Sequence, residues 1–343
     1  MIYGANGYSG ELIARQAQKQ KLSPVIAGRN KNKIKKLADE LGLNYAVFAL
    51  DSKEAIAEQL KDMELVLHCA GPFSKTAKNM LEACLISQTH YLDITGEISV
   101  FELASSMNQQ AKDAGIVICP GVGFDVIPTD CLASQLKELM PDATHLSLGF
   151  DSKSGFSPGT AKTSVEGLSQ GGRVRKEGKI IKVPLAYKTR KIDFGKGEKL
   201  AMTIPWGDVS TAYFTTGIAS IEVYIPASPR LVKRLKKMNY IRPLLGLGFV
   251  QNFLKKRIEK TVKGPNEEQR NKLKTYLWGE VKNAKGESKQ LRLETSNGYT
   301  LTVTGSLKMV EQTLITKKSG YYTPSTLVDN RLLEAIETDT ANN

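Results

Sequence analysis

Apolar and polar positions alternate along the first third of the chain in two distinct periods. Short apolar runs, which predict buried strands, occur at residues 25–28, 45–50, 64–69, 90–94 and 116–119. Segments with apolar residues every three to four positions, which predict helices, occur at residues 11–20, 31–41, 52–60, 74–86 and 100–115. Strands and helices in this order are typical of an α/β domain with a doubly wound parallel sheet, which we assign to residues 1–130.

The pattern changes after residue 130. Strand patterns occur at residues 144–150, 174–193, 199–204, 221–225 and 288–295, and residues 267–281 combine a helix with a strand. Helical spacing returns at residues 299–315 and again from 323 to 336. We therefore expect a second, α+β domain over residues 131–330, carrying substrate and homodimer contacts. Residues 331–343 should hold the end of the last helix and a polar tail, frayed from residue 338.

The chain begins with a short apolar stub and then a glycine-rich turn, Gly4-Ala5-Asn6-Gly7-Tyr8-Ser9-Gly10. Glycine tolerates positive φ and lets the backbone approach a ligand closely, and the amides at the start of the next helix attract an anion. The spacing is G-x-x-G-x-x-G rather than the G-x-G-x-x-G of the NAD fingerprint. The turn predicts a pyrophosphate-binding site in a Rossmann-type domain, and a glycine turn without a ligand is the alternative.

The second predicted strand ends in Gly28 and is followed by Arg29 and Asn30. An acid at this position binds the ribose of NAD, whereas a basic residue accepts the additional phosphate of NADP. Arginine offers a planar fork of donors to that phosphate. The sequence therefore favours NADP (NADPH) as the cofactor, with Arg29 and Asn30 as contacts.

The fourth predicted strand ends in a second turn, Ala70-Gly71-Pro72-Phe73. Ligands of parallel sheets lie beyond the carboxyl ends of the strands. We expect this turn to leave room for the nicotinamide ribose and to bring Phe73 beside the nicotinamide ring. A tight strand-to-helix turn with a core phenylalanine is the alternative.

Several polar side chains are candidates for the chemistry itself. Asp93 and Glu97 follow the fifth strand, and Asp125 and Asp130 lie in the loop after the sixth. We select Asp93 and Asp125 as catalytic candidates, together with Tyr213 as a proton donor. Helix capping and turn formation are the alternative roles for these carboxylates, and a structural role is the alternative for Tyr213.

The chain resembles the saccharopine dehydrogenase-like oxidoreductases. Within this family it is most similar to the branch that contains the trans-acting enoyl reductases. The motifs that carry the resemblance come in the family's order: Tyr3-Gly4-Ala5-Asn6-Gly7-Tyr8-Ser9-Gly10, Cys69-Ala70-Gly71-Pro72-Phe73, His90-Tyr91-Leu92-Asp93-Ile94-Thr95-Gly96-Glu97, Gly123-Phe124-Asp125 with Pro128-Thr129-Asp130, Ser157-Pro158-Gly159-Thr160, Ile204-Pro205-Trp206-Gly207-Asp208, Gly264-Pro265-Asn266-Glu267-Glu268 and Tyr322-Thr323-Pro324. The resemblance covers nearly the whole chain. It implies a Rossmann-type domain that binds NADP, followed by an α/β domain that covers the nicotinamide. The substrate stays open, because members of the family act on amino-acid imines and on lipid enoyl groups.

The sequence departs from the family pattern at its first strand. The family has several more apolar residues before the glycine turn, whereas this chain has Met1-Ile2-Tyr3. We expect either a start site placed too late or a short central strand.

The net charge of +13 is concentrated in one segment. Residues 230–263 contain eleven Lys or Arg and one acid, Glu259, and therefore hold ten of the thirteen charges. The segment lacks the aromatic platforms and groove-reading helix of nucleic-acid proteins, so we expect no nucleic-acid partner. Its apolar centre, Leu244 to Val250, with cationic flanks predicts an element that lies in a membrane interface. Packing on the protein body or on a second subunit is the alternative.

Composition adds constraints on location and metal content. Four single cysteines, Cys69, Cys84, Cys119 and Cys131, predict reduced thiols, and three scattered histidines give no metal site. No apolar run reaches the roughly 18 to 20 residues of a membrane span, and the start lacks the pattern of an export signal. We expect a cytoplasmic protein, peripheral on the inner membrane face if residues 230–263 bind lipid.

Three functional hypotheses follow. The first is an NADP-dependent oxidoreductase that reduces a C=C or C=N bond of a hydrophobic or lipid-linked substrate. The second is a non-catalytic dinucleotide-binding protein associated with a membrane. The third is a saccharopine-type amino-acid dehydrogenase, which needs arginines for the substrate carboxylates and has only Arg173, Arg175 and Arg190 as candidates.

Overall fold

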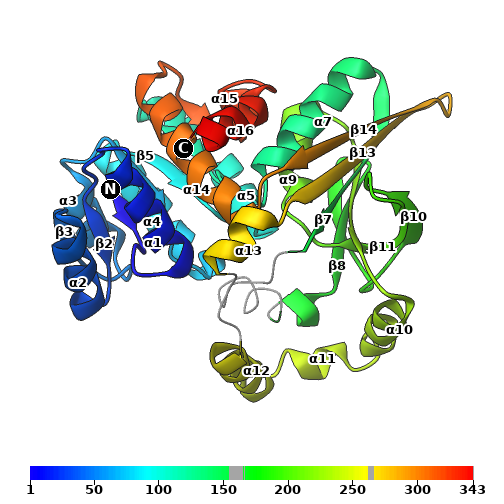
Figure 1. Ribbon diagram of the computed structural model, residues 1–343, viewed down its shortest axis with the longest axis horizontal. Helices are drawn as coiled ribbons and strands as arrows, with labels where there is room; N and C mark the ends of the chain where they lie inside the picture. Colours follow the sequence, from blue (N-terminus) through cyan, green and yellow to red (C-terminus); the bar gives the residue numbers. More distant parts are fainter. Residues whose placement is uncertain (154–164, 166, 262–265, 343) are drawn as a thin grey trace. The chain divides into compact units, whose positions relative to one another are not determined.

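The computed structural model describes residues 1–153, 165, 167–261 and 266–342, and the chain forms two compact units (Figure 1). The first unit comprises Met1–Ile127 and Tyr299–Asn343, and the second comprises Pro128–Gly298. The motif Ser157-Pro158-Gly159-Thr160 and the Gly264-Pro265 pair lie outside the described residues.

The first unit is built on a seven-stranded parallel sheet with the order β15-β6-β5-β4-β1-β2-β3. Its strands are β1 (Ile2–Tyr3), β2 (Ile26–Gly28), β3 (Tyr45–Val47), β4 (Leu65–His68), β5 (His90–Asp93), β6 (Val117–Cys119) and β15 (Gly320–Tyr321). The central order, with β1 between β4 and β2, is that of a doubly wound dinucleotide-binding sheet. The predicted fold class is confirmed for this unit.

Helices connect these strands and cover the sheet. They are α1 (Tyr8–Lys19), α2 (Lys31–Leu41), α3 (Lys53–Leu60), α4 (Phe73–Ser87), α5 (Ile98–Ser106), α6 (Asn108–Asp113), α14 (Gly298–Ile315), α15 (Pro324–Leu327) and α16 (Leu332–Asn342). A single helix was expected over residues 100–115. The structure has two helices there, α5 and α6, because the helical conformation is interrupted at Met107.

The carboxyl-terminal segment also differs from its expectation. The frayed tail expected from residue 338 is wrong for residues 338–342, which continue α16. Ile336 is fully buried, and the Thr340 hydroxyl donates to the Ile336 carbonyl and to the Thr304 hydroxyl. These contacts hold the last turn of α16 against α14.

The central strand β1 is only two residues long. Its residues Ile2 and Tyr3 are buried and pair with both β2 and β4. The Tyr3 hydroxyl donates to the Phe48 carbonyl at 2.9 Å, which satisfies a polar atom inside the sheet layer.

The residues from Tyr299 onward belong to the first unit. The second unit therefore ends at Gly298, whereas the second domain was expected to extend to residue 330. Strand β15 pairs with β6, and the Tyr321 amide donates to the Asn108 side chain at 2.9 Å. From α14, the Thr302 hydroxyl accepts a hydrogen bond from the Phe124 amide at 3.1 Å. The last 45 residues thus extend the parallel sheet and brace the loop that follows β6.

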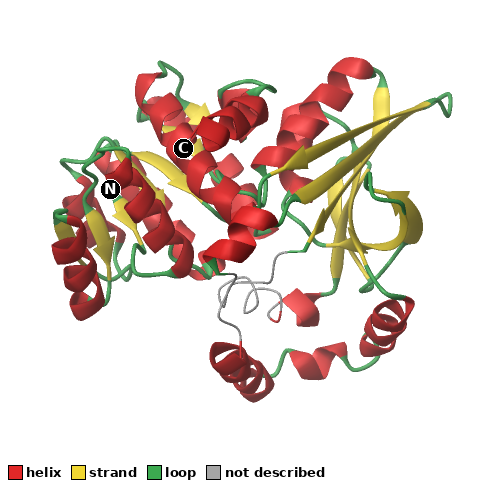
Figure 2. Cartoon of the chain, viewed as in Figure 1, coloured by secondary structure: helices red, strands yellow, loops and turns green. Residues whose placement is uncertain are grey.

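The second unit contains a mixed sheet of eight strands with the main order β10-β11-β12-β7-β13-β14, to which β8 and β9 add a hairpin at β12. Strands are drawn in yellow and helices in red in Figure 2. Its strands are β7 (Ala143–Ser152), β8 (Gly172–Lys176), β9 (Lys179–Val183), β10 (Thr189–Asp193), β11 (Glu198–Ile204), β12 (Ser220–Pro226), β13 (Thr275–Asn283) and β14 (Ser288–Thr295). Its helices are α7 (Ile127–Leu139), α9 (Asp208–Thr216), α10 (Pro229–Met238), α11 (Arg242–Leu245), α12 (Gly248–Thr261) and α13 (Glu267–Lys272). The expected α+β class of this region is confirmed.

Helix α7 packs closely on this sheet at Gly279. A Cβ atom at Gly279 would lie 2.5 Å from a methyl group of Leu136 and 3.2 Å from Leu132, so any side chain there would require these leucines to move. On the same strand, Glu280 accepts both Nη groups of Arg190, at 2.8 and 3.1 Å. This ion pair links β10 to β13 across the sheet.

Candidate cofactor-binding site

The glycine-rich turn joins β1 to α1 at the carboxyl edge of the parallel sheet. Gly4 has φ of +83°, and a Cβ there would lie 2.8 Å from the Ala70 amide nitrogen. The Gly7 amide donates to the Gly4 carbonyl at 2.9 Å, which closes the turn. At Gly10, in the first turn of α1, a Cβ would lie 2.4 Å from the same carbonyl oxygen. The backbone therefore excludes side chains at two of the three glycines.

This turn lies between two other parts of the predicted site. On one side Gly4 touches Ala70, which follows β4, and on the other the Asn6 side-chain oxygen lies close to Gly28, the last residue of β2. Arg29 comes next and is exposed. The structure thus gathers the predicted cofactor residues at one edge of the sheet: Gly4, Ala5, Asn6, Gly7, Tyr8, Ser9, Gly10, Arg29, Asn30, Ala70, Gly71, Pro72 and Phe73.

These residues fit the pyrophosphate of a dinucleotide. The turn has no side chain where its glycines meet the neighbouring backbone, and α1 begins at the same edge, where the amino-terminal end of a helix favours an anion. Asn30 serves a second purpose, because its side chain accepts the Lys33 amide at 3.1 Å and caps α2. Arg29 remains the residue whose chemistry suits a ribose phosphate.

The turn after β4 contains a cis peptide bond between Gly71 and Pro72 and leads into α4. The two oxygens of Glu97 accept the amides of Phe73 and Ser74, at 2.8 and 2.9 Å. A carboxylate at this place satisfies amides that the first turn of α4 leaves unpaired and interacts favourably with the helix dipole. Glu97 therefore fixes the turn that was expected to contact the nicotinamide ribose.

His68, the last residue of β4, lies beneath this turn. Its Nε2 atom is 3.0 Å from the Thr76 hydroxyl, and that hydroxyl donates to the Ala70 carbonyl at 2.7 Å. The ring of Phe73 meets the imidazole edge to face, with centroids 5.3 Å apart. Complete burial lowers the pKa of His68 to about 3, so the imidazole is neutral and supports the turn structurally.

Asp93 is the last residue of β5 and is fully buried. Its carboxylate accepts the Tyr91 hydroxyl at 2.6 Å and the amides of Thr95 and Gly121 at 2.9 and 2.8 Å. Burial raises the pKa of Asp93 to about 6, although these hydrogen bonds act in the opposite direction. The carboxylate thus ties together the loops that follow β5 and β6.

Asp125 lies in the loop between β6 and α7, with its side chain against Gly96. A Cβ at Gly96 would lie 2.7 Å from an oxygen of the Asp125 carboxylate. Desolvation raises the pKa of Asp125 to about 7. The structure therefore brings Asp125 beside the β5 loop that holds Asp93 and Glu97, in the same unit as the glycine turn.

Tyr213 belongs to the second unit, on α9. The guanidinium carbon of Arg175 lies 4.2 Å from the centre of its ring, and the neighbouring Phe214 meets the same ring edge to face, with centroids 5.7 Å apart. Trp206, just after β11, packs against Phe150 of β7 with the ring centroids 4.8 Å apart and the planes tilted by 49°. These contacts hold both aromatic residues within the second unit.

The arginines expected for a saccharopine-type substrate are engaged within the second unit. Arg175 is buried and donates to the carbonyls of Val209 and Gly178 at 2.8 and 2.7 Å. Arg190 pairs with Glu280, and Arg173 donates to the Gln170 carbonyl at 3.0 Å. Two of the three candidates are therefore occupied by strong partners, which disfavours a carboxylate-binding cluster of this composition.

Sequence reasoning missed several residues that shape the site. Glu97 was expected at the edge of the sheet, but nothing in its spacing revealed that it caps α4. Thr302 and Tyr299 come from the last sixth of the chain, where Thr302 braces the Asp125 loop and Tyr299 meets Tyr8 edge to face at 5.1 Å. The apolar spacing of residues 299–315 predicts a helix, but it does not indicate which part of the protein the helix packs against. Within the described ranges no group of three or more His, Cys, Asp or Glu is arranged to hold a metal ion.

The amino-terminal part of the chain is similar to a known family of dinucleotide-binding domains. Residues 1–119 match the family described as saccharopine dehydrogenase NADP binding domain. The lipid droplet localized protein of Caenorhabditis elegans is 26% identical over 274 residues, which cover 71% of this chain and 63% of that protein. The human saccharopine dehydrogenase-like oxidoreductase is 25% identical over 150 residues, or 38% of this chain and 35% of that protein. The trans-acting enoyl reductase of Mycobacterium ulcerans is 28% identical over 138 residues, which cover 38% of this chain and 33% of that protein. The chain thus matches less than two thirds of the length of each relative.

Solved structures share the fold at low sequence identity. Saccharopine dehydrogenase (L-Glu forming) of Saccharomyces cerevisiae matches with a TM-score of 0.60 and 11% identity, covering 99% of this chain and 96% of its own. Homospermidine synthase of Legionella pneumophila, solved with NAD, matches with a TM-score of 0.62 and 10% identity, covering 98% and 88%. Residues 1–119 therefore match the saccharopine dehydrogenase NADP binding domain, and the chain is similar to proteins named saccharopine dehydrogenase-like oxidoreductase and trans-acting enoyl reductase.

Proposed function

We propose that this protein is an NADP-dependent oxidoreductase that reduces a C=C or C=N bond of a hydrophobic, lipid-linked substrate. The observation that carries the proposal is the position of the glycine turn between the ends of β2 and β4, with Arg29 at the end of β2. When bound, the dinucleotide supplies a hydride from the nicotinamide ring. The turn over residues 4–10 would hold the pyrophosphate, Arg29 the ribose phosphate, and residues 70–73 the nicotinamide ribose.

Reduction of a double bond also needs a proton, and Asp125 is our first candidate for its source. A carboxyl group with a pKa of about 7 retains a proton near neutral pH, and general acids work best when their pKa lies near the working pH. Asp93 already accepts three hydrogen bonds, so we assign it the positioning of the β5 and β6 loops. Tyr213 stays an alternative proton donor on the second unit.

We further propose that residues 230–263 attach the protein to an anionic membrane or lipid surface. Between Leu231 and Phe253 seven large apolar side chains are at least 40% exposed, and they include Tyr240 at 90%, Phe249 at 73% and Phe253 at 65%. Phe249 and Phe253 lie one helical turn apart on α12, and cationic residues flank them. This combination suits a helix that lies in the interface of a bilayer. The Caenorhabditis elegans relative is named a lipid droplet localized protein, which favours the same kind of surface.

Peripheral attachment is compatible with the helices of the structure. Of the helices in the described residues, none combines the length and the apolar content that crossing a bilayer requires. The rival hypothesis is a dinucleotide-binding protein without turnover, and oxidation of NADPH with an enoyl or imine substrate separates the two. A cytoplasmic location on the inner membrane face remains part of the proposal.

Replacing Arg29 with alanine should remove the preference for NADPH. Hydrogen bonds to a charged group contribute about 1.5 to 3 kcal/mol, so the Kd of NADPH should rise about 10- to 100-fold, while the Kd of NADH stays unchanged. Nicotinamide fluorescence titrations measure both constants. Lys31→Ala, which removes a nearby charge at the start of α2, is the control and should change neither Kd by more than about threefold. Equal affinity of the wild-type protein for NADPH and NADH would refute the assignment.

Replacing Asp125 with asparagine should flatten the pH dependence of stability. The pKa of Asp125 is about 7 in the folded protein and about 3.9 in an unfolded chain, so unfolding between pH 4 and 7 releases a proton. The free energy of unfolding of the wild type should therefore fall as pH rises through this window. In Asp125→Asn the slope should be smaller by up to about 1.4 kcal/mol per pH unit, as urea denaturation at several pH values would measure. Asp62→Asn, at an exposed acid, should keep the wild-type slope, and an unchanged slope in Asp125→Asn would contradict the assignment.

Replacing Phe249 and Phe253 with serine should weaken membrane attachment. Burial of a phenylalanine contributes about 1.5 to 3 kcal/mol, so partial insertion of both rings predicts at least a tenfold lower partition into vesicles of phosphatidylcholine and phosphatidylglycerol. Flotation of the protein with these vesicles measures the partition. The control is Ile86→Ser with Ile315→Ser, at exposed positions of the first unit. If the Phe249 and Phe253 variant floats like the wild type but changes from dimer to monomer, the surface instead covers a second copy of the chain.

A further inference from the structure

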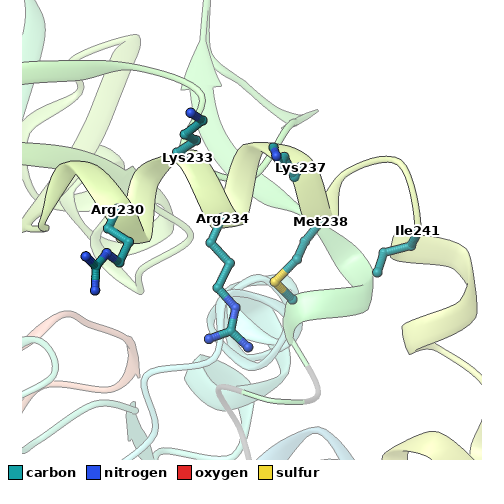
Figure 3. A pocket seen from close by; sticks show the side chains of 6 residues that line it. All are labelled: Arg230, Lys233, Arg234, Lys237, Met238 and Ile241. Carbon is teal, nitrogen blue, oxygen red and sulfur yellow. The ribbon is translucent and has the colours of Figure 1, made fainter.

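Helix α10 carries an open groove lined by Arg230, Lys233, Arg234, Lys237, Met238 and Ile241 (Figure 3). Arg230, Arg234 and Met238 follow one another at a spacing of four residues. Lys233 and Lys237 form the neighbouring row on the same face of the helix, and Ile241 lies just after its end. In Figure 3 the two arginines extend from one side of the helix and the two lysines from the other. Four cationic side chains thus border one shallow groove of about 340 Å³, at the lower end of the range for small-molecule sites.

The opposite face of α10 holds the helix to the second unit. Val232 is buried in a cluster with Ala186 and Met202. Just after the helix, the Asn239 side chain accepts the Leu185 amide at 2.8 Å and donates to the Leu185 carbonyl at 3.2 Å. The Ser228 side chain caps the start of the helix by accepting the Leu231 amide at 3.2 Å. The groove therefore belongs to a fixed helix and faces away from its anchoring contacts.

The four cations have no acidic neighbour on their own helix. Residues 229–238 contain no Asp or Glu, and among the described residues no ion pair involves Arg230, Lys233, Arg234 or Lys237. All four side chains are exposed. Four positive charges at this spacing repel one another, and an anion between them would relieve that repulsion. The groove is thus suited to an anionic group supplied from outside the protein.

The groove becomes apolar toward the carboxyl end of α10. Met238 and Ile241 line that end, and Leu244 follows with 59% of its side chain exposed. Cationic residues at one end and apolar ones at the other match a molecule with an anionic group next to a hydrocarbon part. Arginine binds the oxygens of a phosphate as a planar fork, whereas lysine acts as a point charge.

We propose that the α10 groove is a binding site for the phosphate of an anionic phospholipid headgroup. The site rests on the membrane attachment proposed above and goes beyond it, because it makes attachment depend on phosphate and on two particular arginines rather than on total charge. A soluble phosphate compound would offer the same chemical group, and the titration described below distinguishes it from a lipid headgroup.

The experiment compares flotation with three kinds of phosphatidylcholine vesicle: without additions, with phosphatidylglycerol, and with oleate at equal surface charge. The wild-type protein should bind the phosphatidylglycerol vesicles most strongly. Arg230→Gln with Arg234→Gln should weaken that binding about 30-fold, which corresponds to about 1 kcal/mol for each basic residue. Lys179→Gln with Lys182→Gln removes the same charge from exposed positions on β9 and should weaken it less than threefold.

A charge-preserving variant separates a phosphate site from diffuse attraction. Arg230→Lys with Arg234→Lys keeps the charge and removes both planar forks, so binding to phosphatidylglycerol vesicles should fall several-fold, while binding to oleate vesicles stays unchanged. Titration of the wild type with sn-glycerol 3-phosphate, without vesicles, should give no saturable binding below millimolar concentrations. Tight binding in that titration would overturn the lipid as the source of the phosphate.

Two results would overturn the site in distinguishable ways. If the wild type floats with phosphatidylglycerol but the Arg230→Gln and Arg234→Gln variant behaves like the β9 control, the headgroup site is refuted and the attachment through Phe249 and Phe253 stands. If the wild type floats with none of the vesicles, the attachment itself fails and the headgroup site fails with it.

Discussion

Backbone crowding at the start of α1 is the constraint on which the first unit depends. Gly4 and Gly10 are pressed against the Ala70 amide and the Gly4 carbonyl, at separations that no Cβ could accept. Because the turn is this compact, β1 can be two residues long and still bring the start of α1 to the edge of the sheet. The same crowding keeps side chains away from the place where a pyrophosphate would meet the amides of the helix.

A second set of interactions fixes the loops around that turn. Glu97 binds the first amides of α4, Asp93 binds the loops after β5 and β6, and Thr302 braces the loop of Asp125. Each contact satisfies a backbone amide that would otherwise lack a partner at the end of a strand or helix. The loops expected to face the nicotinamide are therefore held by buried polar groups, which is the preorganisation that a hydride-transfer site requires.

The sequence predicted the first unit well where local patterns decide the structure. Continuous apolar runs marked the buried parallel strands, and glycines marked the one turn where the backbone is crowded. It failed at β15, since a strand of two residues leaves no periodicity, and at residues 338–342, whose helix depends on the burial of Ile336. It also could not tell an engaged arginine from a free one. The partner of Arg190 lies 90 residues away in sequence, and the carbonyl that accepts from Arg175 lies 34 residues away.

The second unit has its charge and its exposed apolar surface in the same place. Helices α10, α11 and α12 carry most of the net charge of the chain. The exposed Phe249 and Phe253 lie on α12, and the exposed Tyr240 lies between α10 and α11. In the sheet of this unit, by contrast, Arg190 is paired with Glu280. Soluble surfaces rarely combine such exposed aromatics with unneutralised cations, and a lipid surface accepts both. The proposed reductase would thereby be located where hydrophobic substrates are concentrated.

The central claim is that the crowded glycine turn binds a pyridine dinucleotide, and isothermal titration calorimetry of NADPH tests it most directly. The wild-type protein should bind one NADPH per chain. Gly10→Ala should weaken binding at least 100-fold, because its Cβ would displace the Gly4 carbonyl, whereas Gly248→Ala, at a glycine with open space around it, should bind like the wild type. Absence of binding to the wild type, or unchanged binding to Gly10→Ala, would contradict the account.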